Sequence, residues 1–199
     1  YRNTPRFNGR PELAGASAVF TAKEYLVPMI TKTKLFERLG FILPTKPLLQ
    51  IITPLCERQR VLSVCSGRCL VEAALSKAGI SVTATDPEVY GRGCSLLPTH
   101  LGVAREKLSA AEAVVKHGDS HKVLFAAAPN EDVWTAELEP AVRAFLVKSE
   151  PESRLFICVC NYMSCQHIVE AMKGVCLLSQ HKLASAMCVF DMCIVMTKE

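Results

Sequence analysis

The chain has 199 residues, half of them hydrophobic, and a formal net charge of +4. A chain of this size can bury one substantial core, and its mild basicity falls short of that of a dedicated nucleic-acid-binding protein. No run reaches the roughly 18 apolar residues of a membrane-spanning helix, so we expect no membrane partner. Ten cysteines, many inside apolar runs, indicate buried thiols and an intracellular, reducing compartment: cytoplasm, nucleus or an organelle matrix.

Residues 1–60 are predicted to form an extension that precedes a domain over residues 61–199. The first eleven residues carry Arg2, Arg6 and Arg10 and no acid, which suits an extended arm that contacts RNA or an acidic protein. A poorly ordered terminus is the alternative. Short helices are expected over residues 17–26, 32–39 and 47–57, and they would cover a binding pocket or shield the sheet.

Residues 61–86 read in order as a strand, a glycine turn, a helix, a second strand and a carboxylate. The apolar run 61–64 enters the turn at Ser66 and Gly67, the helical pattern covers 70–77, Gly79 ends it, and the run 80–85 leads to Asp86. Free N–H groups at the start of the helix favour an anionic group, and Asp86 is placed to accept ribose hydroxyls. This order predicts a nucleotide-binding half-fold.

These residues resemble the first motif of the class I S-adenosylmethionine-dependent methyltransferases, an acidic residue followed by alternating glycines. Ser63 stands at the acidic position, while Cys65, Gly67 and Cys69 stand at the three glycines. The turn Ser66-Gly67-Arg68, with Glu72 after it, is also similar to a subgroup whose turn reads Ser-Gly-Arg-Gly. The resemblance implies an S-adenosylmethionine site in which Asp86 holds the ribose. Its cofactor-binding residues would be Ser63, Cys65, Ser66, Gly67, Asp86 and Pro87.

The resemblance covers about residues 61–198 and implies a three-layer, Rossmann-like α/β sandwich with a mostly parallel sheet and a C-terminal antiparallel hairpin. Buried strands are expected over residues 122–128 and 155–160. Helices are expected over 135–148, with Thr135 as N-cap, and over 164–173. The runs 184–190 and 193–197 would form the hairpin. Residues 104–117 read as one amphipathic helix, with any third strand minimal, at 113–115.

The loop after the fourth strand is the predicted substrate side, because ligands of open α/β sheets bind at the carboxyl ends of the strands. By resemblance, Ala128, Pro129 and Asn130 line the pocket, and Trp134 stacks on a flat substrate or anchors the next helix. Family members that methylate amino groups carry Asn or Asp before the proline, so Ala128 argues against that acceptor. RNA, protein and small molecules stay open as acceptors. No catalytic residue is assigned, because the sulfonium is already an activated methyl donor.

Other chemistries fit the sequence less well. A nicotinamide dehydrogenase needs glycines that are absent from the turn, and the residues around Ser66 lack the pattern of a hydrolase nucleophile. Two cysteine groups are candidate zinc sites, but no metal is expected: the first lacks zinc spacing, and two cysteines of the second lie inside an apolar strand instead of a knuckle turn. They are Cys65, Cys69 and Cys94, and Cys158, Cys160, Cys165 and His167.

A different class of function is a catalytically inactive protein of the same fold, acting as a binding or scaffold subunit in an RNA–protein assembly. Cys65 and Cys69 put side chains where the backbone should approach the ligand, and Ser63 lacks the carboxylate that helps to hold the methionine ammonium. A third possibility is that the fold binds another nucleotide.

Overall fold

The computed structural model describes residues 42, 44–87, 103–127, 134–147, 154–160, 162–183 and 192–198. All of them belong to one compact unit that begins at Leu35. In chain order the elements are α2 (Lys46–Cys56), β1 (Arg60–Val64), α3 (Leu70–Lys77), β2 (Ser81–Thr85), β3 (Arg105–Glu106), α4 (Ala110–His117), β4 (Val123–Ala127), η3 (Trp134–Leu138), α6 (Glu139–Val147), β5 (Leu155–Cys160), α7 (Tyr162–Ala171), β6 (Val175–Lys182) and β7 (Met192–Lys198). A short 3₁₀ turn, η2 (Gly118–Ser120), follows α4.

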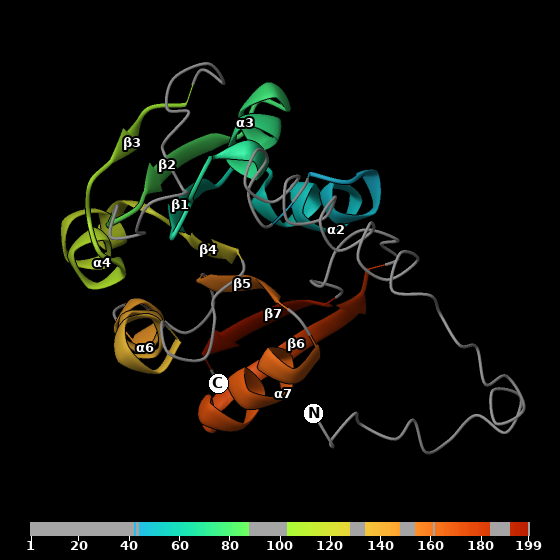
Figure 1. Cartoon of the computed structure of the whole chain (residues 1–199), viewed down its shortest axis with the longest axis vertical. Helices are drawn as coiled ribbons and strands as arrows, with labels where there is room; N and C mark the ends of the chain where they lie inside the picture. Colours follow the sequence, from blue (N-terminus) through green and yellow to red (C-terminus); the bar gives the residue numbers. More distant parts are fainter. Residues whose placement is uncertain are drawn as a thin grey trace, which may run out of the picture. The chain divides into compact units, whose positions relative to one another are not determined.

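The described strands form one seven-stranded sheet in the order β3-β2-β1-β4-β5-β7-β6. Strands β1 to β5 run parallel to their neighbours, whereas β7 is antiparallel to both β5 and β6. Figure 1 shows α2 and α3 on one face of the sheet and α4, α6 and α7 on the other. The predicted three-layer sandwich with a C-terminal antiparallel hairpin is therefore confirmed.

The central strands are buried on both faces and divide their side chains between two cores. Leu62 and Val64 of β1 pack with the layer of α4, α6 and α7, whereas Val61 packs with α2 and α3. Side chains alternate along a strand, so Ser63 faces the same side as Val61. This alternation directs the hydroxyl of Ser63 toward α3. Ser63 is fully buried.

Residues 104–117 do not form a single helix, which corrects the prediction. Arg105 and Glu106 form the short strand β3, and α4 begins only at Ala110. Ser109 starts the helix with a capping box: its hydroxyl accepts from the amide of Glu112 at 3.3 Å, and the Glu112 carboxylate accepts from the amide of Ser109 at 2.8 Å. This reciprocal cap ends the extended segment, and residues 113–115 are helical.

The strand that pairs with β7 is also placed differently from the prediction. It is β6, at residues 175–182, whereas the predicted residues 184–190 lie outside the described part of the chain. Strand β6 is at the edge of the sheet, and neighbouring Leu177 and Leu178 are both exposed. Because the edge strand has no alternation of buried and exposed residues there, its sequence carries a weak strand signal.

Two helix starts can also be compared with the prediction. Thr135 is not an N-cap, because it lies within the π-helical turn η3 that leads into α6. The predicted helix 47–57 is confirmed as α2, which Thr45 caps and which contains Pro54. The predicted helices 17–26 and 32–39 lie outside the described residues. None of the described helices is long and apolar enough to cross a membrane.

Candidate cofactor site at the end of β1

The turn between β1 and α3 alternates into the left-handed backbone region at three positions. The φ angles are 54° at Cys65, 51° at Gly67 and 57° at Cys69. These are the three positions that align with the glycines of the motif. A left-handed conformation costs a residue with a side chain about 1–2 kcal/mol. The turn therefore keeps the conformation of a glycine loop even though cysteine occupies two of its positions.

Two side chains from neighbouring strands bind the centre of this turn. Asp86, which directly follows β2, is 1% exposed, and its Oδ2 accepts from the amide of Gly67 at 2.8 Å. Arg105 of β3 donates from Nη1 to the carbonyl oxygen of Gly67. The amide of Asp86 in turn donates to the carbonyl of Glu106 at 3.0 Å. The acid predicted to hold a ribose thus lies directly against the turn.

A buried network of hydroxyls and one carboxylate lies beneath the turn. The Ser63 hydroxyl donates to Oε1 of Glu72 in α3 at 2.6 Å. The Ser66 hydroxyl has two acceptors within reach, Oγ of Ser63 at 2.9 Å and the carbonyl oxygen of Ser63 at 3.1 Å. Thr85 of β2 donates from Oγ1 to the carbonyl of Ser63 at 3.1 Å. Glu72 is 2% exposed and Ser66 8%. We call the chain Ser66, Ser63 and Glu72 the hydroxyl relay.

Burial raises the pKa of Glu72, because its charged form is removed from water. Hydrogen bonds from Ser63, from its own backbone amide and from Ser66 oppose this rise, and the charge of Asp86 adds to it. Burial likewise raises the pKa of the neighbouring Cys69 thiol to about 12. That thiol is therefore protonated and unreactive as a nucleophile at neutral pH.

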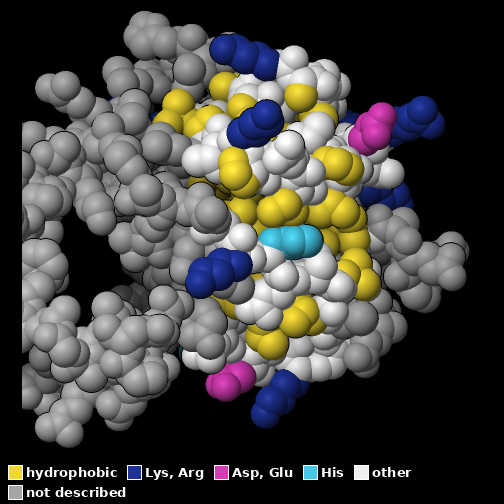
Figure 2. All heavy atoms as spheres, turned by 90° about the vertical axis from the view of Figure 1, so that its right-hand side faces the viewer, with side chains coloured by type: hydrophobic (Ala, Val, Ile, Leu, Met, Phe, Trp, Pro, Cys, Tyr) yellow, Lys and Arg dark blue, Asp and Glu magenta, His cyan; other side chains and the backbone are white. Residues whose placement is uncertain are grey.

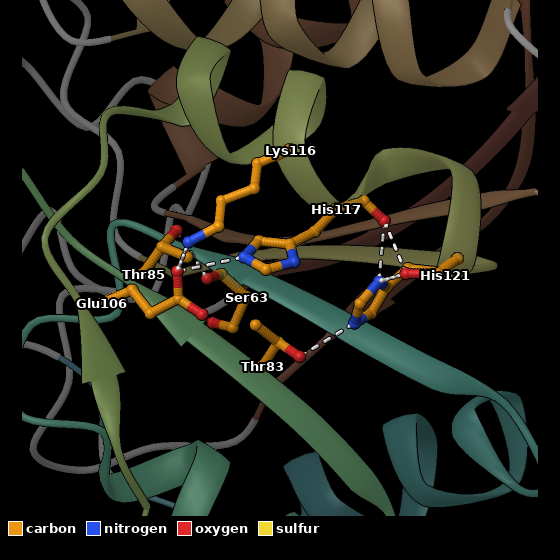
Figure 3. Close-up of polar contacts among 8 residues, drawn as sticks. Ser63, Thr83, Thr85, Glu106, Lys116, His117 and His121 are labelled. Carbon is orange, nitrogen blue, oxygen red and sulfur yellow. Dashed lines mark hydrogen bonds and ion pairs between the residues drawn. The ribbon is translucent and has the colours of Figure 1, made fainter.

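A second polar cluster attaches β3 to α4. Glu106 accepts from Nζ of Lys116 at 2.6 Å and lies 3.1 Å from Nε2 of His117, as Figure 3 shows. Nδ1 of His121 lies 2.8 Å from the carbonyl of His117, and its Nε2 lies 2.9 Å from the hydroxyl of Thr83 in β2. Because Glu106 follows Arg105 directly, this cluster holds the strand that presents Arg105 to Gly67.

The remaining predicted site residues fall into two groups. Pro87 follows Asp86 and is partly buried, at the same end of the sheet as Ser63, Cys65, Ser66 and Gly67. Ala128, Pro129 and Asn130 lie outside the described residues. Trp134 is 1% exposed and packs against Phe156, with ring centroids 6.0 Å apart. Its ring therefore anchors the helix in the core and presents no open face for stacking on a substrate.

Sequence reasoning did not assign a site role to Arg105 or Glu72. Arg105 was hidden because its segment reads as a helix, although it belongs to a two-residue strand. Glu72 could have been found from the sequence, because it is an acidic residue in the first turn of a helix that follows a strand with a polar residue, Ser63. Within the described ranges, no three His, Cys, Asp or Glu side chains converge as a metal site would require.

Comparison with known proteins supports the fold. No protein-family model matches the chain, and no curated protein matches it. Its structure is similar to ribosomal protein L11 methylase from Lactobacillus delbrueckii subsp. bulgaricus (TM-score 0.52, 15% identity, covering 77% of this chain and 78% of that one). It is also similar to precorrin-6y C5,15-methyltransferase from Geobacter metallireducens (0.54, 11%, 81% and 91%). A third similar structure is Pyrococcus abyssi tRNA (uracil-54, C5)-methyltransferase in complex with S-adenosyl-L-homocysteine (0.51, 16%, 75% and 36%). The chain has the fold of the class I S-adenosylmethionine-dependent methyltransferases.

Proposed function

We propose that this protein binds S-adenosylmethionine at the end of β1 and transfers its methyl group to an acceptor. The observation that carries the proposal is the alternating left-handed backbone at residues 65, 67 and 69, placed against the buried carboxylate of Asp86. That combination occurs at the carboxyl ends of β1 and β2, where open α/β sheets bind nucleotides. The solved structure with S-adenosyl-L-homocysteine supports the choice of cofactor.

The residues present fit this cofactor. Gly67 has φ +51°, and a Cβ built at this position would meet no atom within 4 Å, so the side of the turn on which it would lie is open for a ligand to approach the backbone. Asp86 binds the turn through Oδ2 and is 1% exposed, so it would accept ribose hydroxyls only after the residues that cover it move. The neutral Cys69 thiol adds no charge beside the turn.

In this proposal the chain contributes binding and orientation. Asp86 would hold the ribose, and the turn would hold the methionine end. When bound, the cofactor supplies a sulfonium that is already an activated methyl donor, so the protein needs chiefly to align the acceptor and exclude water. No described side chain has to act as a general base for this chemistry.

The acceptor is proposed only as a broad class, RNA, protein or a small molecule, because the names of similar structures include a methylase of each kind. On the face of the molecule that Figure 2 draws, the Lys and Arg side chains of the described residues are dispersed among apolar ones and form no continuous basic stripe. A stripe of that kind is the electrostatic signature of nucleic-acid binding. The arginine-bearing arm at residues 1–11, outside the described part, is our separate proposal for an RNA or acidic-protein contact.

The test of the proposal is calorimetric titration with S-adenosyl-L-homocysteine of the wild-type chain and of Asp86→Ala. We expect micromolar binding by the wild-type chain and a loss of at least about tenfold in the variant, which equals about 1.4 kcal/mol. Ser81→Ala, on the exposed start of β2, is the matched control and should bind like the wild type. A folded wild-type chain that does not bind would contradict the proposal and favour the scaffold alternative.

A reducing compartment is part of the same proposal. Seven cysteines in the described part of the chain are free thiols, and six of these seven are buried. Burial raises the pKa of the Cys56 and Cys193 thiols to about 12, so they serve as apolar core groups. Thiol titration of the native and of the unfolded protein would test this, because we expect most thiols to react only after unfolding.

A further inference from the structure

The structure places a carboxylate where the first motif of this chain lacks one. The resemblance aligns Ser63 with an acidic residue on β1, but Ser63 is fully buried and donates its hydroxyl to Glu72 at 2.6 Å. Glu72 comes from the first turn of α3, so a carboxyl group reaches the end of β1 from the helix instead of the strand. This inference rests on the proposed function and concerns how that same site recognises the cofactor.

The hydroxyl relay can carry the effect of that charge to the turn. The one proton of the Ser63 hydroxyl points at Glu72, so its oxygen lone pairs are left to accept from Ser66 at 2.9 Å. Hydrogen bonds in such a chain polarise one another, particularly in a buried setting of low dielectric constant. Ser66 is the most exposed member of the relay, at 8% against 2% for Glu72, so an incoming group would meet the relay at Ser66.

Burying the carboxyl group of this relay lowers the stability of the fold unless an interaction compensates for it. Glu72 is 2% exposed, no described basic side chain forms a salt bridge with it, and the nearby Asp86 carries a charge of the same sign. Asp86 and the Cys69 thiol are the titratable groups that interact with Glu72, and Arg105 lies near Cys69 and donates to the Gly67 carbonyl. A cationic ligand group at the turn would reduce the electrostatic cost of two neighbouring carboxylates.

We propose that Glu72, acting through Ser63 and Ser66, is the positioning residue for the ammonium of the cofactor's methionine end. The Ser66 oxygen accepts from that ammonium, and the Glu72 carboxylate stabilises the positive charge from beneath. The relay therefore selects ligands that carry the amino-acid group, whereas Asp86 serves the ribose that all adenosine ligands share.

The test compares two ligands that differ in this group. S-adenosyl-L-homocysteine carries the ammonium, and 5′-methylthioadenosine has the same adenosine and sulfur but lacks the amino-acid end. Glu72→Gln keeps the shape and an acceptor oxygen but removes the charge. We expect it to weaken binding of S-adenosyl-L-homocysteine about tenfold, as loss of a charge-assisted interaction does, and to change binding of 5′-methylthioadenosine less than about twofold.

Two further variants keep the inference testable if Glu72→Gln folds poorly. Ser66→Ala should show the same selective loss. The exchange variant, which combines Ser63→Asp with Glu72→Ser, returns the carboxylate to β1 and should recover most of the discrimination between the ligands. Thermal unfolding of each variant verifies that it is folded.

The possible outcomes distinguish failure of the relay inference from failure of the proposed function. Equal weakening of both ligands, or no weakening of either by Glu72→Gln, contradicts the relay while leaving the proposed function in place. A folded wild-type chain that binds neither ligand contradicts the proposed function, and the relay inference with it. Failure of the exchange variant, when Glu72→Gln has shown the selective loss, contradicts the role of the charge itself.

Discussion

The two halves of the sheet bury different kinds of side chain. At the carboxyl ends of β1 and β2, five buried polar residues lie within one network or beside it: Ser63, Ser66, Glu72, Thr85 and Asp86. They are five of the eight buried polar or charged residues in the described part of the chain. The half formed by β4, β5 and β7 is filled by apolar side chains and thiols such as Cys158.

This difference indicates which half contributes most to stability, and the other half is the one where we propose that the cofactor binds. Burial of apolar side chains is favourable, whereas a buried polar group contributes little net stability even when it is hydrogen-bonded. Near Cys158 burial raises the thiol pKa, and the neighbouring thiols, Cys160 first, add to the rise, so that region is uncharged. The polar half keeps two carboxylates close together, which core packing alone does not require.

The largest effect is expected from the apolar half. Phe156→Ala removes a fully buried ring that packs against Trp134, and should lower the free energy of unfolding by about 3–5 kcal/mol. Leu177→Ala, at an exposed position of the edge strand β6, is the matched control and should change it by less than about 0.5 kcal/mol. Urea denaturation measures both, and similar effects of the two substitutions would contradict this division of the sheet.

The contribution of the polar half to the free energy of unfolding should depend on pH, whereas that of the apolar half should not. Because burial raises the folded-state pKa of Glu72, this group favours the folded state below its unfolded pKa of about 4.3, and that contribution is lost as pH rises through the folded pKa. Glu72→Gln stays neutral, so its stability relative to wild type should increase with pH, by an amount on the order of 1 kcal/mol. Urea unfolding of the variant and of the wild type across pH 4 to 9 measures this. A stability difference between them that does not change with pH would contradict it.

At the left-handed turn the sign of the effect depends on the residue that replaces Cys65. Cys65→Gly should stabilise the chain by up to about 1 kcal/mol, because relief of the left-handed conformation exceeds the added chain entropy of glycine. Cys65→Val places a branched side chain at the same φ and should destabilise it by about 1–2 kcal/mol. Equal unfolding midpoints for the two variants would show that φ at this position is not positive in solution.

The cluster behind β3 should give the smallest effect, and it depends on pH in the opposite sense. Burial lowers the folded-state pKa of His121, so its contribution is present above the unfolded value of about 6.5 and is lost as pH falls through the folded pKa. His121→Gln should cost about 1 kcal/mol at pH 8 and less at pH 5. Thermal unfolding at both values checks this, and a cost that grows toward pH 5 would contradict it.

The sequence predicted the elements that have strong local signals. Strands β1, β2, β4 and β5 are continuous apolar or β-branched runs, and α3 ends at Ala78 just before Gly79, which has φ +85°. Strand β6 was missed because an edge strand does not need apolar alternation, and β3 was missed because its two residues fall below any periodicity. The contact of Arg105 with Gly67 joins residues 38 positions apart, so it depends on tertiary packing that no local pattern contains.

Near β1, the positions of the candidate site residues could be predicted from the sequence, but their hydrogen-bond partners could not. The motif located Ser63, Gly67 and Asp86, because their spacing follows from the strand-turn-helix-strand order. It left open that Asp86 binds the Gly67 amide and that Ser63 is paired with Glu72. The first contact depends on how the end of β2 lies beside the turn, and the second on which side of α3 faces β1, so both are set by tertiary packing.

Hydrogen exchange with mass spectrometry, in the presence and absence of S-adenosyl-L-homocysteine, tests the central claim most directly. The account predicts slower exchange on binding over residues 65–72 and 84–87, where the turn, the relay and Asp86 lie, and unchanged exchange in β5 and β7. Protection confined to β5, β7 or another part of the chain, with the residues of the turn unaffected, would contradict a cofactor site at the end of β1.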